Sequence, residues 1–243
     1  MREKGSLKGV WEWILDAVFP RRCPVCDEIL GTDGIRVCPG CREAFQILRE
    51  PICRRCGKPI KDAEEEYCSD CLKRRHEFDQ GAALYEYASV RESIYRFKYM
   101  GRQEYKEFYG EEISRYLGRQ IREWNADLLL PVPIHAARMR KRGYNQAELL
   151  AEEIGRRLSI PVMKKTAWRV RKTVPQKGLN VSERQNNLKK AFKIRQNDVK
   201  LKTIIIIDDI YTTGSTIDAL AGECRRAGAE KVYFVVLAMG NSL

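Results

Sequence analysis

The 243-residue sequence lacks any long apolar segment. No apolar run approaches about 18 residues, so no transmembrane helix and no membrane insertion are expected. The N-terminus also lacks the apolar core of a signal peptide, which predicts a cytoplasmic protein. Hydrophobic residues make up 44% of the chain, which is enough for a packed core and excludes a disordered chain.

Acidic residues are scarce in one segment. Residues 164–202 hold thirteen Lys or Arg against two acids, which is +11 of the net charge of +12. Such a field attracts polyanions, either diphosphates or nucleic acid. A solvated basic surface is the alternative, but it accounts poorly for an excess confined to one segment.

Cysteine, in contrast, is regularly repeated in the first part of the chain. Four Cys-x-x-Cys pairs are separated from one another by eleven residues. Two such pairs can complete a tetrahedron around Zn²⁺, so the eight thiols predict two closed structural sites. The expected ligands are Cys23, Cys26, Cys38, Cys41, Cys53, Cys56, Cys68 and Cys71.

Other uses of these cysteines are less consistent with the pattern. A cytoplasmic setting disfavours disulfides, and a redox dithiol does not require four repeated pairs. Iron–sulfur ligation remains a further alternative. Sequential pairing of the motifs is the simplest arrangement, although a crossed one fits the same spacing. With few apolar residues between the ligands, the module is expected to unfold without metal.

The chain is predicted to have two parts. Residues 1–80 would form an N-terminal helix and a double Cys₄ zinc-ribbon module. Apolar residues on one face of the segment 7–18 favour a helix that packs on the protein, with a membrane-surface helix as the alternative. In residues 81–243, apolar strands near 81–87, 127–133, 162–170, 204–207 and 232–238 alternate with helical patterns. This alternation predicts an α/β domain with a mainly parallel sheet flanked by helices.

The segment 203–216 joins a strand to a polar turn. Four consecutive isoleucines, at 204–207, predict a strand buried on both faces. Asp208 and Asp209 follow, and the turn through Gly214 leads into a helical pattern that Gly228 would end. Backbone N–H groups at a helix start receive phosphate, and carboxylates at the end of a parallel strand suit ribose hydroxyls, directly or through Mg²⁺.

These residues resemble the phosphoribosyl pyrophosphate (PRPP) loop of the type I phosphoribosyltransferases. The resemblance implies that Asp208 and Asp209 hold the ribose hydroxyls. It also implies that the 5′-phosphate is held by Thr212, Thr213, Gly214, Ser215 and Thr216. Tyr211 is bulkier than the aliphatic residue usual in the loop. The similar 6-oxopurine enzymes carry Asp where this chain has Thr212, which argues against hypoxanthine or guanine as acceptor. A buried strand that ends in a polar turn is the alternative.

A second basic group follows the predicted strand at 127–133. Arg138, Arg140, Lys141 and Arg142 occur with no acid among them, and their segment should project onto the same rim as Asp208. Guanidinium groups there could bind a pyrophosphate leaving group as its charge develops. A basic exposed loop is the alternative.

A long basic stretch with Pro175 and Gly178 lies between two core strands and is expected to close as a lid over a diphosphate site. For nucleic acid, the expected contacts are Arg169, Arg171, Lys172, Lys177 and Arg184. Tyr144 and Trp168 are nearby aromatic residues on which single strands could stack.

Four further motifs sharpen the resemblance. They are Pro131-Val132-Pro133-Ile134-His135, Arg142-Gly143-Tyr144-Asn145-Gln146, Thr173-x-x-Gln176-x-x-Leu179 and Glu183-Arg184-x-x-Asn187. Together with the Cys-x-x-Cys repeats, they resemble the ComF family over nearly the whole chain. That resemblance implies a zinc-finger module joined to a phosphoribosyltransferase domain. It further implies a role in natural competence, in which the protein handles incoming single-stranded DNA beside a helicase partner.

Two classes of function therefore remain open. The protein could bind Mg²⁺ and PRPP and transfer the phosphoribosyl group to a nitrogen nucleophile. It could instead be a non-catalytic DNA-binding protein or helicase-docking adaptor that keeps the fold as a scaffold or sensor.

Overall fold

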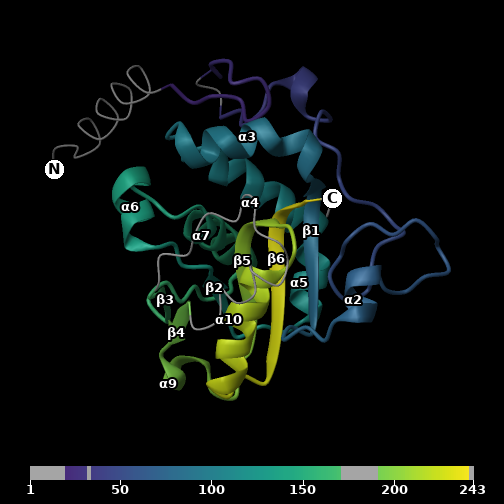
Figure 1. Ribbon diagram of the computed structural model, residues 1–243. Coiled ribbons are helices and arrows are strands. Elements are labelled where there is room, and N and C mark those ends of the chain that lie inside the picture. The colour runs from purple at the N-terminus through teal and green to yellow at the C-terminus, as the bar shows by residue number, and fades with distance from the viewer. Residues whose placement is uncertain (1–19, 32–33, 171–190, 241–243) are drawn as a thin grey trace, which may run out of the picture.

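A computed structural model describes residues 20–31, 34–170 and 191–240 of the chain (Figure 1). Its main sheet has four strands in the order β1-β6-β5-β2, and every neighbouring pair is parallel. The strands are β1 (Gln80–Glu86), β2 (Leu128–Pro131), β5 (Thr203–Tyr211) and β6 (Lys231–Met239). The central strand β5 is buried over residues 204–207, as the run of isoleucines predicts. The predicted mainly parallel sheet flanked by helices is therefore confirmed.

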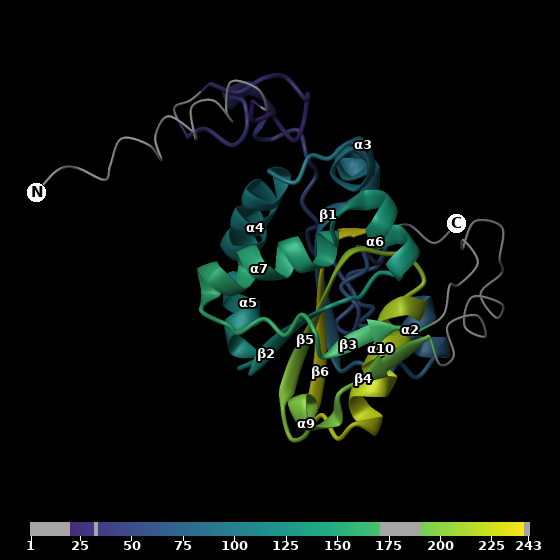
Figure 2. The same cartoon turned by 90° about the vertical axis from the view of Figure 1, so that its left-hand side faces the viewer.

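Helices cover both faces of this sheet (Figure 2). Side chains of β5 at 205 and 207 face α3 (Tyr87–Tyr99), α4 (Tyr105–Tyr116) and α7 (Gln146–Leu158). Side chains at 204 and 206 face α10 (Ser215–Arg226), where Cys224 is fully buried. The remaining helices of the domain are α5 (Gly118–Glu123), α6 (Ala136–Arg142) and α9 (Gln196–Val199). None of the helices in the described ranges is long and apolar enough to span a membrane.

The structure differs from the expected elements at three places. The helical pattern over residues 106–124, which predicts one continuous helix, is divided between α4 and α5. The basic segment after β2 contains the helix α6, which the sequence pattern did not predict. In the expected strand at 162–170, only β3 (Ala167–Arg169) forms, and it pairs antiparallel with β4 (Phe192–Ile194) outside the main sheet.

The cysteine-rich segment lies on two sides of the sheet. Its first part, up to the 3₁₀ turn at Pro39–Cys41, lies beside α3 and α4. Its second part, with α2 (Ser69–Lys73), belongs to the buried cluster on the α10 face. The chain between them pairs antiparallel with β1, through bonds from Leu48 N to Leu84 O and from Glu86 N to Gln46 O, each 2.9 Å. This pairing covers the open edge of β1, which would otherwise expose unpaired backbone groups.

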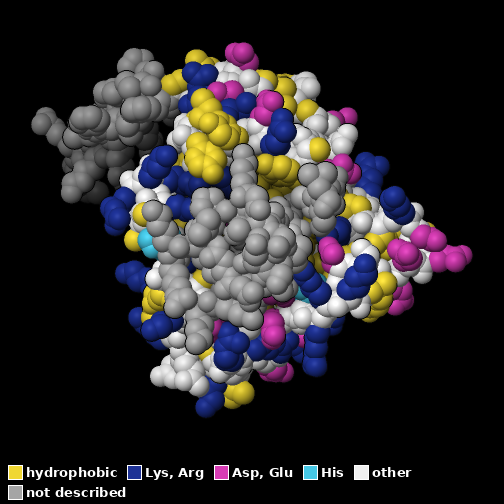
Figure 3. All heavy atoms as spheres, viewed as in Figure 1, with side chains coloured by type: hydrophobic (Ala, Val, Ile, Leu, Met, Phe, Trp, Pro, Cys, Tyr) yellow, Lys and Arg dark blue, Asp and Glu magenta, His cyan; other side chains and the backbone are white. Residues whose placement is uncertain are grey.

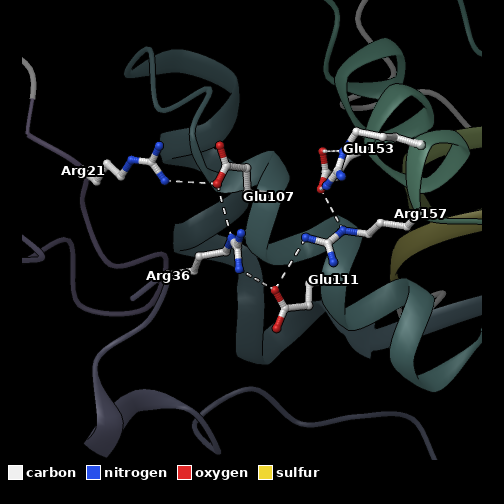
Figure 4. Close-up of polar contacts among 7 residues, drawn as sticks. Arg21, Arg36, Glu107, Glu111, Glu153 and Arg157 are labelled. Carbon is white, nitrogen blue, oxygen red and sulfur yellow. Dashed lines mark hydrogen bonds and ion pairs between the residues drawn. The ribbon is translucent and has the colours of Figure 1, made fainter. Parts of the chain in front are cut away.

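Ion pairs hold the first part of the cysteine-rich segment to the helices (Figure 4). Arg36 contacts Glu107 at 3.2 Å and Glu111 at 2.8 Å, both on α4. Arg21 contacts Glu107 at 3.1 Å, while Arg157 of α7 contacts Glu111 at 3.5 Å. The two acids thus connect the cysteine-rich segment to both α4 and α7. The N-terminal helix expected at 7–18 lies outside the described residues.

Candidate functional site

A cavity of about 620 Å³ opens at the carboxyl edge of the sheet. It lies where the chain leaves β2 toward α7 on one face and leaves β5 toward α10 on the other. Open α/β sheets bind their ligands at such a point. Three segments supply its lining: residues 132–146 after β2, residues 208–216 at the end of β5 and in the turn that follows, and the end of α3. Arg169 of β3 completes it.

The two acids lie within β5, near its carboxyl end. The sequence pattern predicts a position directly after the strand. Asp208 accepts a hydrogen bond from the backbone N–H of Asp209 at 2.9 Å. Asp209 forms an ion pair with Lys98 Nζ at 2.9 Å, and both of these side chains are mostly buried, at 13% and 17% exposure. Lys98 belongs to α3 and is a site residue that the sequence analysis missed. It holds Asp209 in a fixed position on the cavity wall.

Asp208 has a perturbed ionisation. Burial, together with the neighbouring Asp209 carboxylate, raises its pKa to about 7 against the opposing charges of Lys98 and Arg169. A carboxyl group with this pKa is ionised only in part near neutral pH. Perturbed groups of this kind cluster at functional sites, and the cavity position of Asp208 agrees with that tendency.

The turn after β5 has the geometry of an anion site. Gly214 has φ +72°, a conformation that side-chain-bearing residues rarely adopt, and it precedes the first residue of the twelve-residue helix α10. The first N–H groups of a helix have no partner within the helix and can donate to an anion. Thr213 and Ser215 hydroxyls lie 2.9 Å apart, while Thr212 and Thr216 line the cavity. The five turn residues are thus brought beside the acidic pair.

Tyr211 packs beneath this turn, with its hydroxyl close to Gly214. Its ring stacks on Phe234 with centroids 5.0 Å apart, and it meets the edge of Phe78 at 6.4 Å. A Cβ atom added at Gly214 would lie 2.3 Å from the Tyr211 hydroxyl oxygen. Tyr211 also belongs to the buried cluster that contains Cys56 and the other cysteines of the second group. Tyr211, whose bulk was noted in the sequence, therefore connects this anion-type turn (residues 212–216) to the cysteine module.

The basic residues after β2 lie opposite the turn, on α6. The side chain of His135 caps this helix through Ala137 N, and Gly143, with φ +82°, ends it. Arg138, Lys141 and Arg142 line the cavity, whereas Arg140 is exposed and does not. Figure 3 shows Lys and Arg side chains gathered over this region. Cations in a last turn also stabilise the helix itself, but three of these four additionally face the acids.

The expected nucleic-acid contacts divide into several groups. Arg169 lines the same cavity as Asp208 and stacks on Phe192 at 5.4 Å. Arg171, Lys172, Lys177 and Arg184, the expected lid and the motifs at 173–187 lie outside the described residues. Trp168 is 44% exposed, so its ring is accessible. The interpretation of Tyr144 as a stacking surface was wrong, because its ring is buried and its hydroxyl donates to Phe97 O.

The eight cysteines form two groups by sequential pairing of the motifs. Cys23, Cys26, Cys38 and Cys41 make the first group, and Cys53, Cys56, Cys68 and Cys71 make the second, with the ligand atoms of each within 4.8 Å of one another. The Sγ atoms of Cys26 and Cys38 are 3.8 Å apart, and those of Cys56 and Cys68 are 3.7 Å apart. A tetrahedron with metal–sulfur bonds of about 2.3 Å has edges of about 3.8 Å. Both groups therefore fit a structural Zn²⁺ ion.

His76 is not part of either group. Its Nδ1 lies 2.8 Å from Asp218 Oδ2, at the start of α10, and its ring stacks on Phe78. It joins the end of the second cysteine group to the helix that carries the anion-type turn.

Two family models match this chain. A double zinc ribbon domain matches residues 14–72, and a phosphoribosyl transferase domain matches residues 144–243. The first covers both cysteine groups, which supports structural zinc at each. The second begins two residues after α6 and covers α7, the acidic pair and the turn.

Named proteins are similar to this chain over part of its length. The chain is 30% identical to competence protein F of Haemophilus influenzae over 67% of its own length and 74% of that protein. It is 36% identical to DNA utilization protein YhgH of Salmonella typhi over 44% of its length and 46% of that protein. It is 29% identical to competence protein ComFC of Bacillus subtilis over 57% of its length and 55% of that protein. The chain belongs to the ComF family of competence proteins, in which a double zinc ribbon is joined to a phosphoribosyltransferase domain.

Proposed function

We propose that this protein binds PRPP with Mg²⁺ at the carboxyl edge of the sheet and acts on single-stranded DNA in natural competence. One observation carries the first half of the proposal: the acidic pair and the anion-type turn face three cations of α6 across one cavity. PRPP carries a phosphate at one end, a diol in the middle and a diphosphate at the other end. The cavity offers a complementary group for each.

Each part of PRPP has its own partners in this proposal. The 5′-phosphate lies at the start of α10, where N–H groups and the hydroxyls of the turn donate to it. The ribose hydroxyls are held by Asp208 and Asp209. The diphosphate meets Arg138, Lys141 and Arg142, whose charges neutralise the leaving group as it separates from C1. The residues thus position PRPP and stabilise charge, and no covalent help from the protein is needed.

Mg²⁺ fits this donor set. It prefers oxygen ligands and is usually bound through one or two carboxylates together with substrate phosphates. Asp208 and Asp209 offer such oxygens, although Lys98 already occupies one oxygen of Asp209. Bound magnesium would supply positive charge at the diphosphate. Thr212 provides no carboxylate beside the acceptor, so a nucleophile that requires a base at this position is not served.

A calorimetric titration tests the PRPP site. Zinc-loaded protein is titrated with PRPP and Mg²⁺ beside the Asp208→Asn/Asp209→Asn variant and an Asp62→Asn control, whose exposed carboxylate lies in the second cysteine segment. Saturable binding by the wild type and the control, lost in the double variant, supports the proposal. Absence of binding by folded wild-type protein refutes it.

A non-catalytic DNA-binding or helicase-docking adaptor is the second candidate. The names of the relatives, the charge of segment 164–202 and the exposed ring of Trp168 favour it. In that case, charge-neutralising substitutions in the segment should weaken DNA binding and flatten its salt dependence, whereas the double Asn variant still binds DNA. A helicase that co-purifies equally well with the neutralised protein would instead favour the adaptor.

A further inference from the structure

A second cavity, of about 530 Å³, adjoins the first on the outer side of α3. It is bounded by this helix and by Asp27, the residue that follows Cys26 of the first cysteine group. Lys98, Tyr99 and Ile210 line both cavities, so the two are continuous along the carboxyl edge of the sheet. Neither the acidic pair nor the anion-type turn uses this second cavity.

Aromatic rings stand exposed along this side of α3. Tyr95 is 58% exposed and Tyr99 is 61% exposed, and their ring centroids are 5.1 Å apart at an interplanar angle of 48°. Arg91 precedes them by one turn on the same helix face and is also exposed. Figure 3 shows hydrophobic side chains gathered over α3, with Lys and Arg side chains beside them. The pattern Arg91, Tyr95, Tyr99 repeats every four residues, or about 6 Å along the helix axis.

This spacing suits a single strand better than a duplex. Stacked bases in a duplex rise only about 3.4 Å per step, so two tyrosine rings whose centroids are 5.1 Å apart could each receive a base only from a strand whose bases are splayed. Every base has a flat face that can stack on a tyrosine ring regardless of sequence. Because more than half of each ring is open to solvent, a strand can pass across the rings without being threaded into a closed pocket.

The charges around the rings favour a polyanion. The Arg142 guanidinium lies 4.8 Å from the centre of the Tyr99 ring, at the boundary between the two cavities. Arg91 lies at the other end of the row. The lining also holds two acids, Asp27 and Glu92. Arg102 donates to both oxygens of Asp27 at 2.9 and 3.0 Å. Arg96 lies 4.0 Å from Glu92, so each acid has an arginine partner. Arginines therefore flank the two rings on both sides.

We propose that the outer face of α3 binds single-stranded DNA, with bases stacked on Tyr95 and Tyr99 and a phosphate held by Arg91. This inference rests on the DNA half of the proposed function and gives that half a location. It moves the stacking surface from Tyr144, which is buried, to a helix beside the first zinc ribbon. The strand would then run along the rim of the PRPP cavity.

Fluorescence anisotropy with a labelled oligothymidine tests the proposal on the full, zinc-loaded chain. Tyr95→Ala should weaken binding at least five-fold, and Tyr95→Ala/Tyr99→Ala should weaken it more than ten-fold, because each stacked base contributes substantially to affinity. Tyr95→Phe keeps the ring and should bind as the wild type does. Arg91→Gln should lower the slope of log K against log salt by about one.

Tyr116→Ala is the matched control. Tyr116 is also exposed, at 45%, and also has an arginine beside its ring, with Arg115 at 5.3 Å, but it lies at the far end of α4. The Tyr116→Ala variant should bind oligothymidine as the wild type does. Thermal unfolding and PRPP titration of Tyr95→Ala, whose side chain lines only the second cavity, confirm that the fold and the first site are intact.

The outcomes separate this inference from the proposed function. If wild-type protein fails to bind single-stranded DNA, both the DNA half of the function and this inference are refuted, and the PRPP half stands alone. If Tyr95→Ala/Tyr99→Ala binds like the wild type while neutralised variants of segment 164–202 do not, the DNA lies elsewhere and only this inference is refuted. If the double variant keeps DNA binding but loses a co-purifying helicase, the α3 face docks a protein and the inference is likewise refuted.

Discussion

Replacing Asp208 by Asn is expected to stabilise the protein while it removes PRPP binding. In the unfolded chain this carboxyl group loses its proton near pH 3.8, whereas in the folded protein burial and Asp209 raise its pKa to about 7. Between those two values the folded state holds the proton more tightly than the unfolded state does. Stability therefore falls as the pH rises through this window, and an uncharged Asn escapes that loss.

The size of the effect follows from the shift in pKa. A difference of about 3 units at 1.36 kcal/mol per unit gives an upper bound of about 4 kcal/mol at pH 8. Because Asp208 keeps some contact with solvent, we expect about 1–3 kcal/mol. For a chain of this length that corresponds to a rise in Tm of roughly 3–10 °C. The Asn oxygen can still accept the hydrogen bond from Asp209 N, so the local structure is preserved.

Thermal unfolding of zinc-loaded protein at pH 8 and pH 5.5 measures this effect. The Tm advantage of Asp208→Asn should be clearly smaller at pH 5.5, where the folded wild type is still protonated. Asp209→Asn is the control with the opposite sign, since it leaves the mostly buried Lys98 without its partner and should lower Tm. A Tm for Asp208→Asn that is lower than wild type at pH 8, or an advantage that does not change with pH, would contradict the reasoning.

Three further predictions concern the cysteine module and the turn. Metal analysis should find two zinc ions per chain. The variant Cys56→Ser, in the buried second group, should lose one zinc ion and lower the Tm by several degrees. A single zinc ion in the wild type would exclude the double site. Arg36→Ala should lower the free energy of unfolding by about 1 kcal/mol or less, since its partners Glu107 and Glu111 are partly exposed. It should speed proteolysis of the first ribbon without changing the zinc content. Unchanged proteolysis would show that this network does not hold the ribbon. Gly214→Ala should abolish PRPP binding and lower Tm, because the residue needs a positive φ and its Cβ would meet the Tyr211 hydroxyl. Tyr211→Phe should relieve the contact but not the backbone strain, so calorimetry of the double variant should show at most partial recovery.

Features carried by adjacent residues could be predicted from the sequence. The cysteine spacing predicted two groups of four thiols, because each pair is held by a turn of four residues. The spacing left sequential and crossed pairing open, and only the structure places the pairs together in chain order. The strand at 204–207, the two acids and the turn through Gly214 also form one short segment whose geometry is local. The fold class followed from the alternation of strands and helices, which depends on local periodicity alone.

Tertiary structure decided the contacts between distant segments. Lys98 of helix α3 reaches Asp209 of strand β5, and Tyr211 packs between Phe78 and Phe234 beside the second cysteine group. No periodicity encodes such pairs, because they depend on how the elements pack. The sequence also could not predict that Tyr144 is buried and Tyr95 is exposed. Both residues are tyrosines, and only the packing of the elements determines which ring meets solvent.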